Sequence, residues 1–523
     1  MSDSLAASYD RVPYDSRPRY ATHPDCLATL GTLLGMKPAP VERCRVLELG
    51  CSTGGNLLPL AETYPGSRFT GWDLSSSQIE TGRKVAHALG LTNLTFEARN
   101  LLEIEGKIGE FDYIICHGVY SWVPEAVRDK ILSLCKTLLA PQGIAYVSYN
   151  TYPGWYLRSG VRDLMNFHTR EIADPGEKVR QARGIVDFFL DHSSDPDNTW
   201  SRALRDEAEV IRPEGDYYVF HEHLEEHNHA VYFWQFVEHA RRHGLHYLGE
   251  AQSHATLSAY PPDVQEYLRN VSRDLLHLEQ YLDFMKNRMF RRTLLVHEAV
   301  PLNRQPGPEV VEPLFASGMA RPVSPDPEVL TDRVEEFVNE DGATVSTPLP
   351  FAKAILLTLF ERWPEALSFS DLLEAVGERI GDLAKAMTLA QAQGFLARSL
   401  AHLYLSNMVG LHTIKPSFTL HPWERPLAPA LIRLQAKTGA KVCNRRHKLV
   451  PLSVFDRALL SLCDGKTSRT GLSEQLARMV QMGEVELQRE GVPVTELGKI
   501  REAVSQEIEP GLERLARSMV LIA

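Results

Sequence analysis

The sequence of 523 residues lacks several patterns that mark membrane, secreted and zinc-binding proteins. Its seven cysteines include no C-x-x-C pair, so we expect reduced thiols, no disulfide framework and no metal site. No apolar run approaches the roughly 18 residues that a membrane span needs. The segment Met1 to Ser4 has neither the basic region nor the apolar stretch of a secretory signal. We therefore expect a cytoplasmic protein without membrane insertion.

Positive charge is also in short supply. The chain has 56 Lys and Arg against 67 Asp and Glu, a formal net charge of −11. This balance opposes long-range attraction to phosphate backbones, so we expect no nucleic-acid partner. The hydrophobic fraction of 44% is ordinary for a globular protein, and the length predicts three or four domains.

The most informative segment runs from Val46 to Asn56, where an apolar strand leads into a glycine-rich turn. The turn does not match the G-x-G-x-x-G spacing of a dinucleotide-binding loop, because its glycines are Gly50, Gly54 and Gly55. Glu48, just before the first glycine, would repel a pyrophosphate but attract an ammonium group. The segment therefore predicts a loop that approaches a ligand with a positively charged amino-acid moiety.

A second acid lies about 20 residues further on, at the end of the predicted strand Arg68 to Asp73. A carboxylate at this spacing suits hydrogen bonds from both hydroxyls of a ribose. Ser75 and Gln78 form a capping box that predicts the start of the next helix. Glu48 and Asp73 are thus expected to hold opposite ends of one nucleoside-containing ligand.

Strands alternate with helices through the first half of the chain, which predicts a parallel sheet with helices on both faces and ligands at the carboxyl ends of its strands. Beyond the two strands above, we expect strands over 94–98, 111–116, 144–149, 217–220 and 246–250, with a turn at 141–143. Helices are expected over 258–300 and a Pro-rich polar link over about 301–347. The predicted fold class is α/β, and the predicted divisions are a lead-in over 1–41, a core over 42–257 with a helical insertion over 155–215, a mostly α middle domain over 258–347, a winged-helix-like domain over 348–420 and a C-terminal helical domain over 421–523.

Segments along most of the chain resemble bacterial methyltransferases that carry a methyltransferase regulatory domain. They are similar to the rickettsial-type outer-membrane-protein lysine methyltransferases in particular. The resemblance rests first on the glycine turn, which looks like the first motif of class I S-adenosylmethionine (SAM) methyltransferases. It extends to His117–Pro124, Tyr149–Trp155, His221–Glu225, Tyr281–Phe284 with Phe290 and Arg291, and Asn444–His447 with Leu462–Gly465.

This resemblance implies a Rossmann-like, seven-stranded core that binds SAM, with an inserted dimerisation segment, which makes 155–215 the candidate for a homodimer contact. It also implies a protein substrate whose lysines accept the methyl group, as in members that modify outer-membrane proteins. Asn100 departs from the pattern, because an acid commonly contacts the adenine amine there. The expected cofactor-binding residues are Glu48, Gly50, Cys51, Ser52, Gly54, Asn56, Asp73, Leu74, Gln78, Asn100, Leu101 and His117.

The acceptor channel is expected where strands four and five end. Methyl transfer from a sulfonium is an in-line displacement, so positioning and exclusion of water dominate. A lysine must first lose a proton, and burial between aromatic rings lowers the pKa of its amine. The predicted catalytic residues are His117, Tyr120, Trp122, Asn150, Tyr152 and Trp155.

Two other clusters have simpler interpretations. The histidines between His221 and His246 lack a third ligand at fixed spacing, so a metal site is not favoured. Arg288, Arg291 and Arg292 lie beside several acids and are more typical of a solvated helix face than of a phosphate site. Three functions remain open: a protein-lysine methyltransferase, a methyltransferase of small molecules or natural products, and a SAM-sensing regulatory module.

Overall fold

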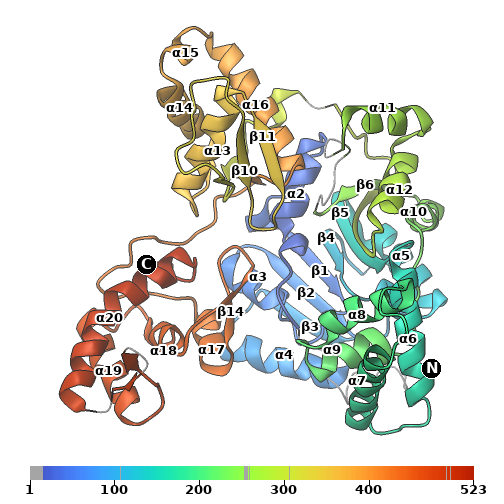
Figure 1. Ribbon diagram of the computed structural model, residues 1–523, viewed down its shortest axis with the longest axis horizontal. Helices are drawn as coiled ribbons and strands as arrows, with labels where there is room; N and C mark the ends of the chain where they lie inside the picture. Colours follow the sequence, from blue (N-terminus) through green and yellow to red (C-terminus); the bar gives the residue numbers. More distant parts are fainter. Residues whose placement is uncertain are drawn as a thin grey trace.

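The computed structural model describes residues 16–106, 108–252, 257, 260–305, 307–489, 492–494 and 496–523. Its centre is a seven-stranded sheet in the order β3-β2-β1-β4-β5-β7-β6 (Figure 1). β7 is antiparallel to both of its neighbours, whereas the other paired strands are parallel. The strands are β1 (Arg45–Leu49), β2 (Arg68–Asp73), β3 (Leu94–Ala98), β4 (Phe111–Cys116), β5 (Leu139–Asn150), β6 (Leu245–Glu250) and β7 (Phe290–His297).

The first four strands lie where the sequence predicts them. In β1 the residues from Val46 to Leu49 are all buried, as expected for an inner strand covered on both faces. β5 is longer than predicted, because it begins at Leu139 and includes the expected turn at 141–143. The pairing of β4 with β5 shifts register between Phe111 and Tyr113, and this irregularity accommodates the extra residues.

The predicted sixth strand, over 217–220, is wrong. This segment forms α9 (Asp216–Val219) and the beginning of the π-helix η5 (Phe220–Leu224). The missing strand is β7, in a region for which the sequence predicted helix only. The sheet therefore continues beyond residue 257, where the predicted core ended.

β7 also corrects the interpretation of the arginine cluster as a solvated helix face. Arg291 is 1% exposed, and its guanidinium donates to Asp283, Glu250 and Glu279 over 2.8 to 3.0 Å. Its ring of acids offsets the cost of burying the charge. The sequence does not identify β7 as a buried strand, because one of its buried residues is the charged Arg291.

Helices cover both faces of the sheet and create two hydrophobic cores. One core is formed with α2 (Pro24–Leu33), α3 (Leu57–Thr63) and α4 (Ser76–Ala88). The other is formed with α5 (Glu125–Leu138) and α10 (Phe233–Arg242). α5 and α10 bury apolar residues at helical spacing, whereas α3 is buried continuously from Leu57 to Ala61.

The insertion is helical, as expected, and extends beyond residue 215 to the end of η5. It comprises α6 (Trp155–Thr169), α7 (Pro175–Asp191), α8 (Thr199–Ile211), α9 and η5. Val161, Val179 and Leu204 belong to a separate hydrophobic cluster within these helices. The insertion is thus a small helical unit attached to the carboxyl ends of the core strands (Figure 1).

Two helices, α11 (Pro262–Val271) and α12 (Leu275–Lys286), precede β7. Two further units follow the core. In the first of them, which we call the middle unit, the expected polar link over 301–347 instead contains four short strands. These are β8 (Phe315–Ser317), β9 (Arg321–Pro322), β10 (Glu335–Val338) and β11 (Thr344–Thr347). They pack with α13 (Pro350–Arg362), β12 (Leu367–Ser368), α14 (Phe369–Ile380), α15 (Asp382–Lys385), α16 (Leu389–Leu405) and β13 (Gly410–His412).

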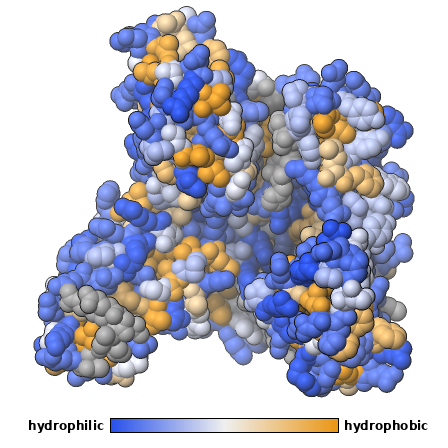
Figure 2. All heavy atoms as spheres, in the orientation of Figure 1, coloured by the Kyte–Doolittle hydropathy of each residue, from blue (hydrophilic) through white to orange (hydrophobic). Residues whose placement is uncertain are grey.

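The C-terminal unit has its own hydrophobic core. It contains α17 (Ala430–Thr438), β14 (Lys441–Cys443), β15 (Leu449–Pro451), α18 (Val454–Leu462), α19 (Arg469–Gln481), β16 (Gln488–Arg489), β17 (Val492–Pro493) and α20 (Leu497–Arg517). Figure 2 shows that the molecule is hollowed between this unit, the unit of α13–α16 and the core with its insertion. In the described part of the chain, no helix has the length and apolar character to cross a membrane.

Candidate functional site

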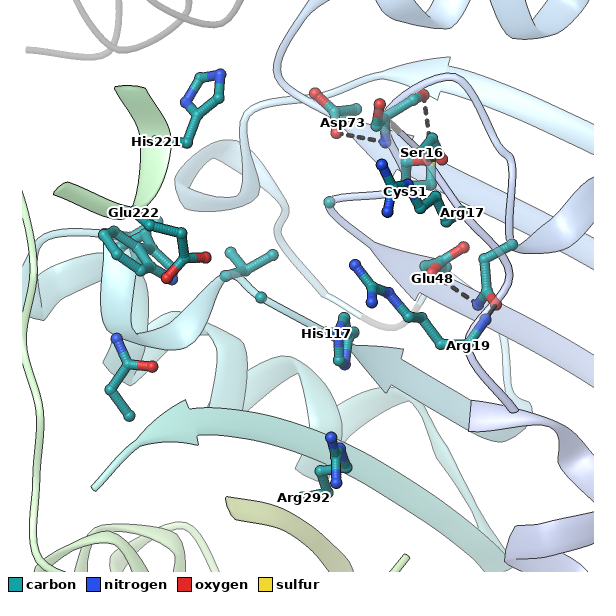
Figure 3. Close-up of a pocket in the computed structure, with 18 of the residues that line it drawn as sticks. Ser16, Arg17, Arg19, Glu48, Cys51, Asp73, His117, His221, Glu222 and Arg292 are labelled. Carbon is teal, nitrogen blue, oxygen red and sulfur yellow. Dashed lines mark hydrogen bonds between the residues drawn. The ribbon is translucent and has the colours of Figure 1, made fainter. Parts of the chain in front are cut away.

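A cavity of about 800 Å³ lies at the carboxyl ends of the core strands (Figure 3). This is the edge at which ligands bind in open α/β sheets. It brings together most of the residues predicted from the sequence. Those that line it are Glu48, Gly50, Cys51, Ser52, Asn56, Asp73, Leu74, Gln78, Asn100, Leu101, His117, Trp122, Asn150 and Trp155.

The turn after β1 depends on two glycines. Gly50 has a φ of +75° and Gly54 a φ of +78°, both in the left-handed region that other residues avoid. A Cβ on Gly54 would lie 2.1 Å from the ring of Phe96, and one on Gly50 would lie 2.4 Å from Val119. Gly54 is absent from the cavity wall, and its role is to let the turn pack against the sheet.

Asp73 holds this turn in place. Its Oδ2 accepts a hydrogen bond from the backbone N–H of Ser52 over 2.8 Å, and its Oδ1 accepts from that of Ser75 over 2.9 Å. Ser52 also hydrogen-bonds to Gln78 through its hydroxyl. The carboxylate at the tip of β2 is therefore fixed by the backbone on two sides while it lines the cavity.

Glu48 is buried at the tip of β1, with 5% of its surface exposed. Its Oε1 accepts from Asn56 Nδ2 over 2.9 Å, whereas Oε2 has no hydrogen-bond partner among the described residues. Burial raises the pKa of Glu48 to about 8, and the negative charge of Asp73 adds to this effect, while Asn56 and Arg19 oppose it. A cationic ligand would supply both the missing partner and the missing charge.

Asn100 and Leu101 start the 3-10 helix η3 (Leu101–Glu103). The side-chain oxygen of Asn100 accepts from the backbone N–H of Leu102 over 3.1 Å, and its amide nitrogen donates to Glu103. Asn100 thus acts as a helix cap and also lines the cavity.

His117 follows β4 and lies between the two halves of the cavity wall (Figure 3). Its Nδ1 shares a hydrogen bond of 2.8 Å with the hydroxyl of Tyr146. Burial and the charges of Arg19 and Arg292 hold the pKa of His117 well below its usual value. The imidazole is therefore neutral near pH 7.

Two predicted channel residues do not line the cavity. Tyr120 is 2% exposed in the core, where its hydroxyl hydrogen-bonds to His239 Nδ1 over 2.7 Å. Tyr152 stacks on Tyr156 with ring centroids 4.1 Å apart. It also packs against the Trp122 and Trp155 pair, whose rings meet edge to face. Both tyrosines follow strand ends, as predicted, but neither side chain lines the cavity.

Sequence reasoning missed the part of the wall that comes from distant segments. Arg17 and Arg19 of the lead-in line the cavity, and Arg17 hydrogen-bonds to Tyr217 of the insertion. Residues 1–15 of the predicted lead-in lie outside the described part of the chain. Other missed residues that line the cavity are Arg158, Tyr218, His221, Glu222, His227, Arg292, His447 and Lys448.

Glu222 is the most informative of these residues. It lies in the π-helix η5, a rare form that is often found at functional sites. Figure 3 shows its carboxylate directed into the cavity from the side opposite Glu48. Burial raises its pKa, with Arg158 opposing and Glu207 adding to the shift. The sequence His221–Glu225 carried the family resemblance, but no residue spacing linked it to the glycine turn.

Part of the histidine cluster gathers outside the cavity wall. His239 Nε2 and His243 Nε2 lie 3.2 and 2.8 Å from Asp129 Oδ1. No third ligand is evident beside these histidines in the sequence, because Asp129 lies far away along the chain, on α5. Both imidazoles hydrogen-bond to this one carboxylate through Nε2.

The cavity fits the cofactor that the glycine turn implies. The unpaired Oε2 of Glu48 suits the ammonium of the amino-acid end, and Asp73 suits the ribose hydroxyls. Leu74, Asn100 and Leu101 lie beyond Asp73, where the base would follow the sugar. Gly50 also lines the cavity, and the absence of its Cβ leaves room for the side chain of Val119.

Comparison with known proteins agrees with this geometry. Family models match residues 46–143 as a methyltransferase domain and residues 215–297 as a predicted methyltransferase regulatory domain. A third model, described as PKMT, C-terminal winged helix domain, matches residues 424–520. The sequence predicted a helical group in that last segment and placed its winged-helix-like unit earlier, over 348–420.

Two proteins resemble the chain over almost its full length. RP789 of Rickettsia prowazekii is 34% identical and aligns over 98% of this chain and 93% of its own. The structure of PKMT2 from Rickettsia typhi in complex with AdoHcy has a TM-score of 0.85 and 31% identity, and covers 98% of this chain and 100% of its own. A third, RP028 of Rickettsia prowazekii, is 42% identical over 45% of this chain and 94% of its own.

The fold, the cavity and these matches define a SAM-dependent methyltransferase with a Rossmann-like core. The cofactor is SAM, which supplies an electrophilic methyl group on a sulfonium when bound. More particularly, the chain belongs to the family that includes RP789 and PKMT2.

Proposed function

We propose that this enzyme N-methylates lysine side chains of a protein substrate. The observation that carries the proposal is the composition of the cavity opposite Glu48. Besides Glu48, another carboxylate, Glu222, and two indoles, Trp122 and Trp155, line this cavity. An aromatic wall attracts a cation, and a carboxylate orients an ammonium group.

The cavity wall is built from several units of the chain, and this also supports a protein substrate. Residues of the lead-in, core, insertion and C-terminal unit contribute to one cavity. The molecule is hollowed between these units (Figure 2), so a lysine on a folded surface or loop has a route to the methyl group. The PKMT winged-helix match and the likeness to PKMT2 support the same substrate class.

The chain must neutralise the acceptor before transfer. Deprotonating a lysine of ordinary pKa near pH 7.4 costs about 4 kcal/mol. Burial between Trp122 and Trp155 lowers the pKa of the amine, and Glu222 is the group that first binds the ammonium and then takes up its proton. Its raised pKa makes it a better base than an exposed glutamate. Asn150 and His117 orient the amine for in-line attack.

The substrate class is tested by labelling. Purified enzyme is incubated with SAM labelled in its methyl group and a lysate of bacterial cell-envelope proteins, and the labelled protein is hydrolysed to amino acids. We expect alkali-stable label that co-migrates with methylated lysines. Label in the small-molecule fraction would instead support a natural-product methyltransferase, and alkali-labile label would support carboxyl methylation. No transfer to any fraction, with intact SAM binding, would favour a SAM-sensing module.

The homodimer and the cell-envelope substrate are part of the same proposal. The insertion exposes large apolar side chains on one helix pair, with Phe167 70% and Phe188 55% exposed. Such side chains are the usual material of an interface between copies. Sedimentation of the enzyme is expected to give a dimer, and charged substitutions at both positions should yield a monomer.

A further inference from the structure

The tip of the β14–β15 hairpin connects the C-terminal unit to the rest of the molecule. Arg445 donates to the hydroxyl of Thr63 on α3 over 2.7 Å, and Arg446 donates to Ser317 and to the carbonyl of Pro364. His447 reaches the cofactor turn, where its Nε2 lies 2.8 Å from Asn56 Oδ1. One turn of backbone therefore contacts the core and the middle unit at once.

His447 adopts a conformation that its surroundings must impose. Its φ is +57°, in the left-handed region that costs a non-glycine residue energy, and it is 3% exposed. The turn is fixed by Asn444, whose side-chain oxygen accepts from the backbone N–H of Arg446 and of Lys448 over 3.0 Å. The hairpin is thus built to present this imidazole at one place.

The hydrogen bonds that link Asn56 to His447 and to Glu48 have a defined direction, and Thr22 Oγ1 lies 3.2 Å from the Asn56 oxygen and 3.0 Å from its amide nitrogen. The backbone N–H of Arg19 can only donate, and it lies 2.9 Å from the Asn56 oxygen, which fixes that atom as the acceptor. His447 Nε2 must therefore carry a proton and donate to the same oxygen. The Asn56 amide nitrogen is left to donate to Glu48 Oε1 over 2.9 Å.

The protonation states agree with this arrangement. Burial and the neighbouring His23 hold the pKa of His447 well below its usual value, so the ring is neutral with its single proton on Nε2. Burial raises the pKa of Cys443 to about 12, so the group 4.0 Å from His447 Nδ1 is a thiol. A neutral imidazole with its proton on Nε2 can therefore donate to Asn56 beside a neutral thiol.

We propose that His447, supplied by the C-terminal unit, is a positioning residue of the SAM site. By donating to Asn56 it fixes the amide whose nitrogen holds Glu48, and it thereby orients the carboxylate that receives the ammonium of the cofactor. The C-terminal unit completes the cofactor site of the core through this contact. The inference depends on SAM as cofactor and is independent of the acceptor that the enzyme methylates.

The chemistry of the ligand separates this role from general support of the fold. S-adenosylhomocysteine (AdoHcy) has the amino-acid end that Glu48 binds, whereas 5′-methylthioadenosine has the same thionucleoside without it. A residue that acts through Asn56 and Glu48 changes the affinity for AdoHcy alone. A residue that only supports the fold changes the affinity for both ligands.

Two substitutions at one position provide the test. His447→Asn tolerates the left-handed conformation but is too short to reach Asn56, whereas His447→Gln keeps an N–H donor at about the same reach. Calorimetric titration should show AdoHcy binding weakened about tenfold in His447→Asn and largely restored in His447→Gln. Binding of 5′-methylthioadenosine should change less than about twofold in both variants, because this ligand lacks the ammonium group that Glu48 binds.

A control and a double variant complete the experiment. Asp456→Asn breaks the ion pair with Arg514 inside the C-terminal unit and should leave the ratio of the two affinities unchanged. Combined with Glu48→Gln, His447→Asn should add little further loss for AdoHcy, because both act along one path. Equal weakening of both ligands in His447→Asn, or full additivity with Glu48→Gln, would overturn the proposal.

Discussion

Glu48 combines a buried carboxylate, a raised pKa and an unpaired oxygen at the tip of β1. These properties are costly in an empty site, because a buried charge without a partner is destabilised. They become favourable when the ammonium of SAM provides the counter-charge. At the scale of single residues, the cofactor site is therefore poised to change protonation when it is filled.

The first prediction concerns this proton. Near pH 7 the free enzyme holds Glu48 mostly protonated, since its pKa is about 8, and the bound ammonium lowers that pKa. AdoHcy binding at pH 7 should thus release close to one proton, and affinity should rise between pH 6 and 8. Titration in buffers of different ionisation enthalpy measures the release. Glu48→Gln should remove it, and an unchanged release in that variant would refute the assignment.

The second prediction concerns the acceptor wall. Glu222→Gln keeps the shape of the side chain but cannot take up a proton, so kcat should fall about a hundredfold with little change in AdoHcy affinity. Trp122→Ala should raise KM for the protein substrate. Trp423→Ala, at an indole of the C-terminal unit that is 69% exposed, serves as the control and should keep wild-type turnover. Wild-type kcat in Glu222→Gln would show that another group receives the proton.

The sequence predicts site residues best where they belong to one short segment of the chain. The glycine turn and Asp73 identify themselves by spacing, because their geometry is local to two strands and one turn. Glu222 and His447 reach the cavity from segments far along the chain, and only the tertiary fold brings them there. Tyr120 and Tyr152 were misplaced because a position at a strand end does not determine which way a side chain points.

Secondary elements show the same limit. β1 to β4 were predicted with their observed bounds, except that β1 begins one residue earlier. β7 was missed because Arg291 interrupts its pattern with a charge that is buried among acids. The segment 217–220 has strand-like composition but folds as α9 and η5, since tertiary packing in the insertion overrides local preference.

The third prediction tests the ion cluster that anchors β7. Arg291→Met leaves Asp283 and Glu250 buried without their main partner, so the free energy of unfolding should fall by about 3 to 5 kcal/mol. Denaturant unfolding measures the loss. Arg333→Met removes an exposed pair with Glu328 and should cost less than about 1 kcal/mol. Equal effects of the two substitutions would contradict a structural role for the buried cluster.

The fourth prediction concerns the start of α2. His23 caps this helix, its Nδ1 accepting from the backbone N–H of Asp25 over 3.0 Å, and burial lowers its pKa to about 4. The unfolded chain binds the proton first, so this contribution is complete above pH 6.5 and is lost as the pH falls towards 4. The loss is about 1.4 kcal/mol per pH unit. The melting temperature of His23→Asn should depend less steeply on pH over this window, and an unaltered slope would contradict the account.

At the scale of the whole molecule, one cavity unites parts that the sequence placed in separate divisions. The lead-in, core, insertion and C-terminal unit all line it, and the hollow in Figure 2 opens between them. Composition and resemblance predicted a series of divisions along the chain. Their meeting at one site was not predicted, because single hydrogen bonds such as that of His447 to Asn56 define it.

The most direct test of the account is calorimetric titration of the full chain with SAM, in wild type and in Asp73→Ala. We expect one site per chain in the wild type and at least tenfold weaker binding in the variant, because Asp73 both binds the ribose and fixes the glycine turn. Absence of binding heat in the wild type, or equal affinity in the two proteins, would contradict the claim that SAM lies between the tips of β1 and β2.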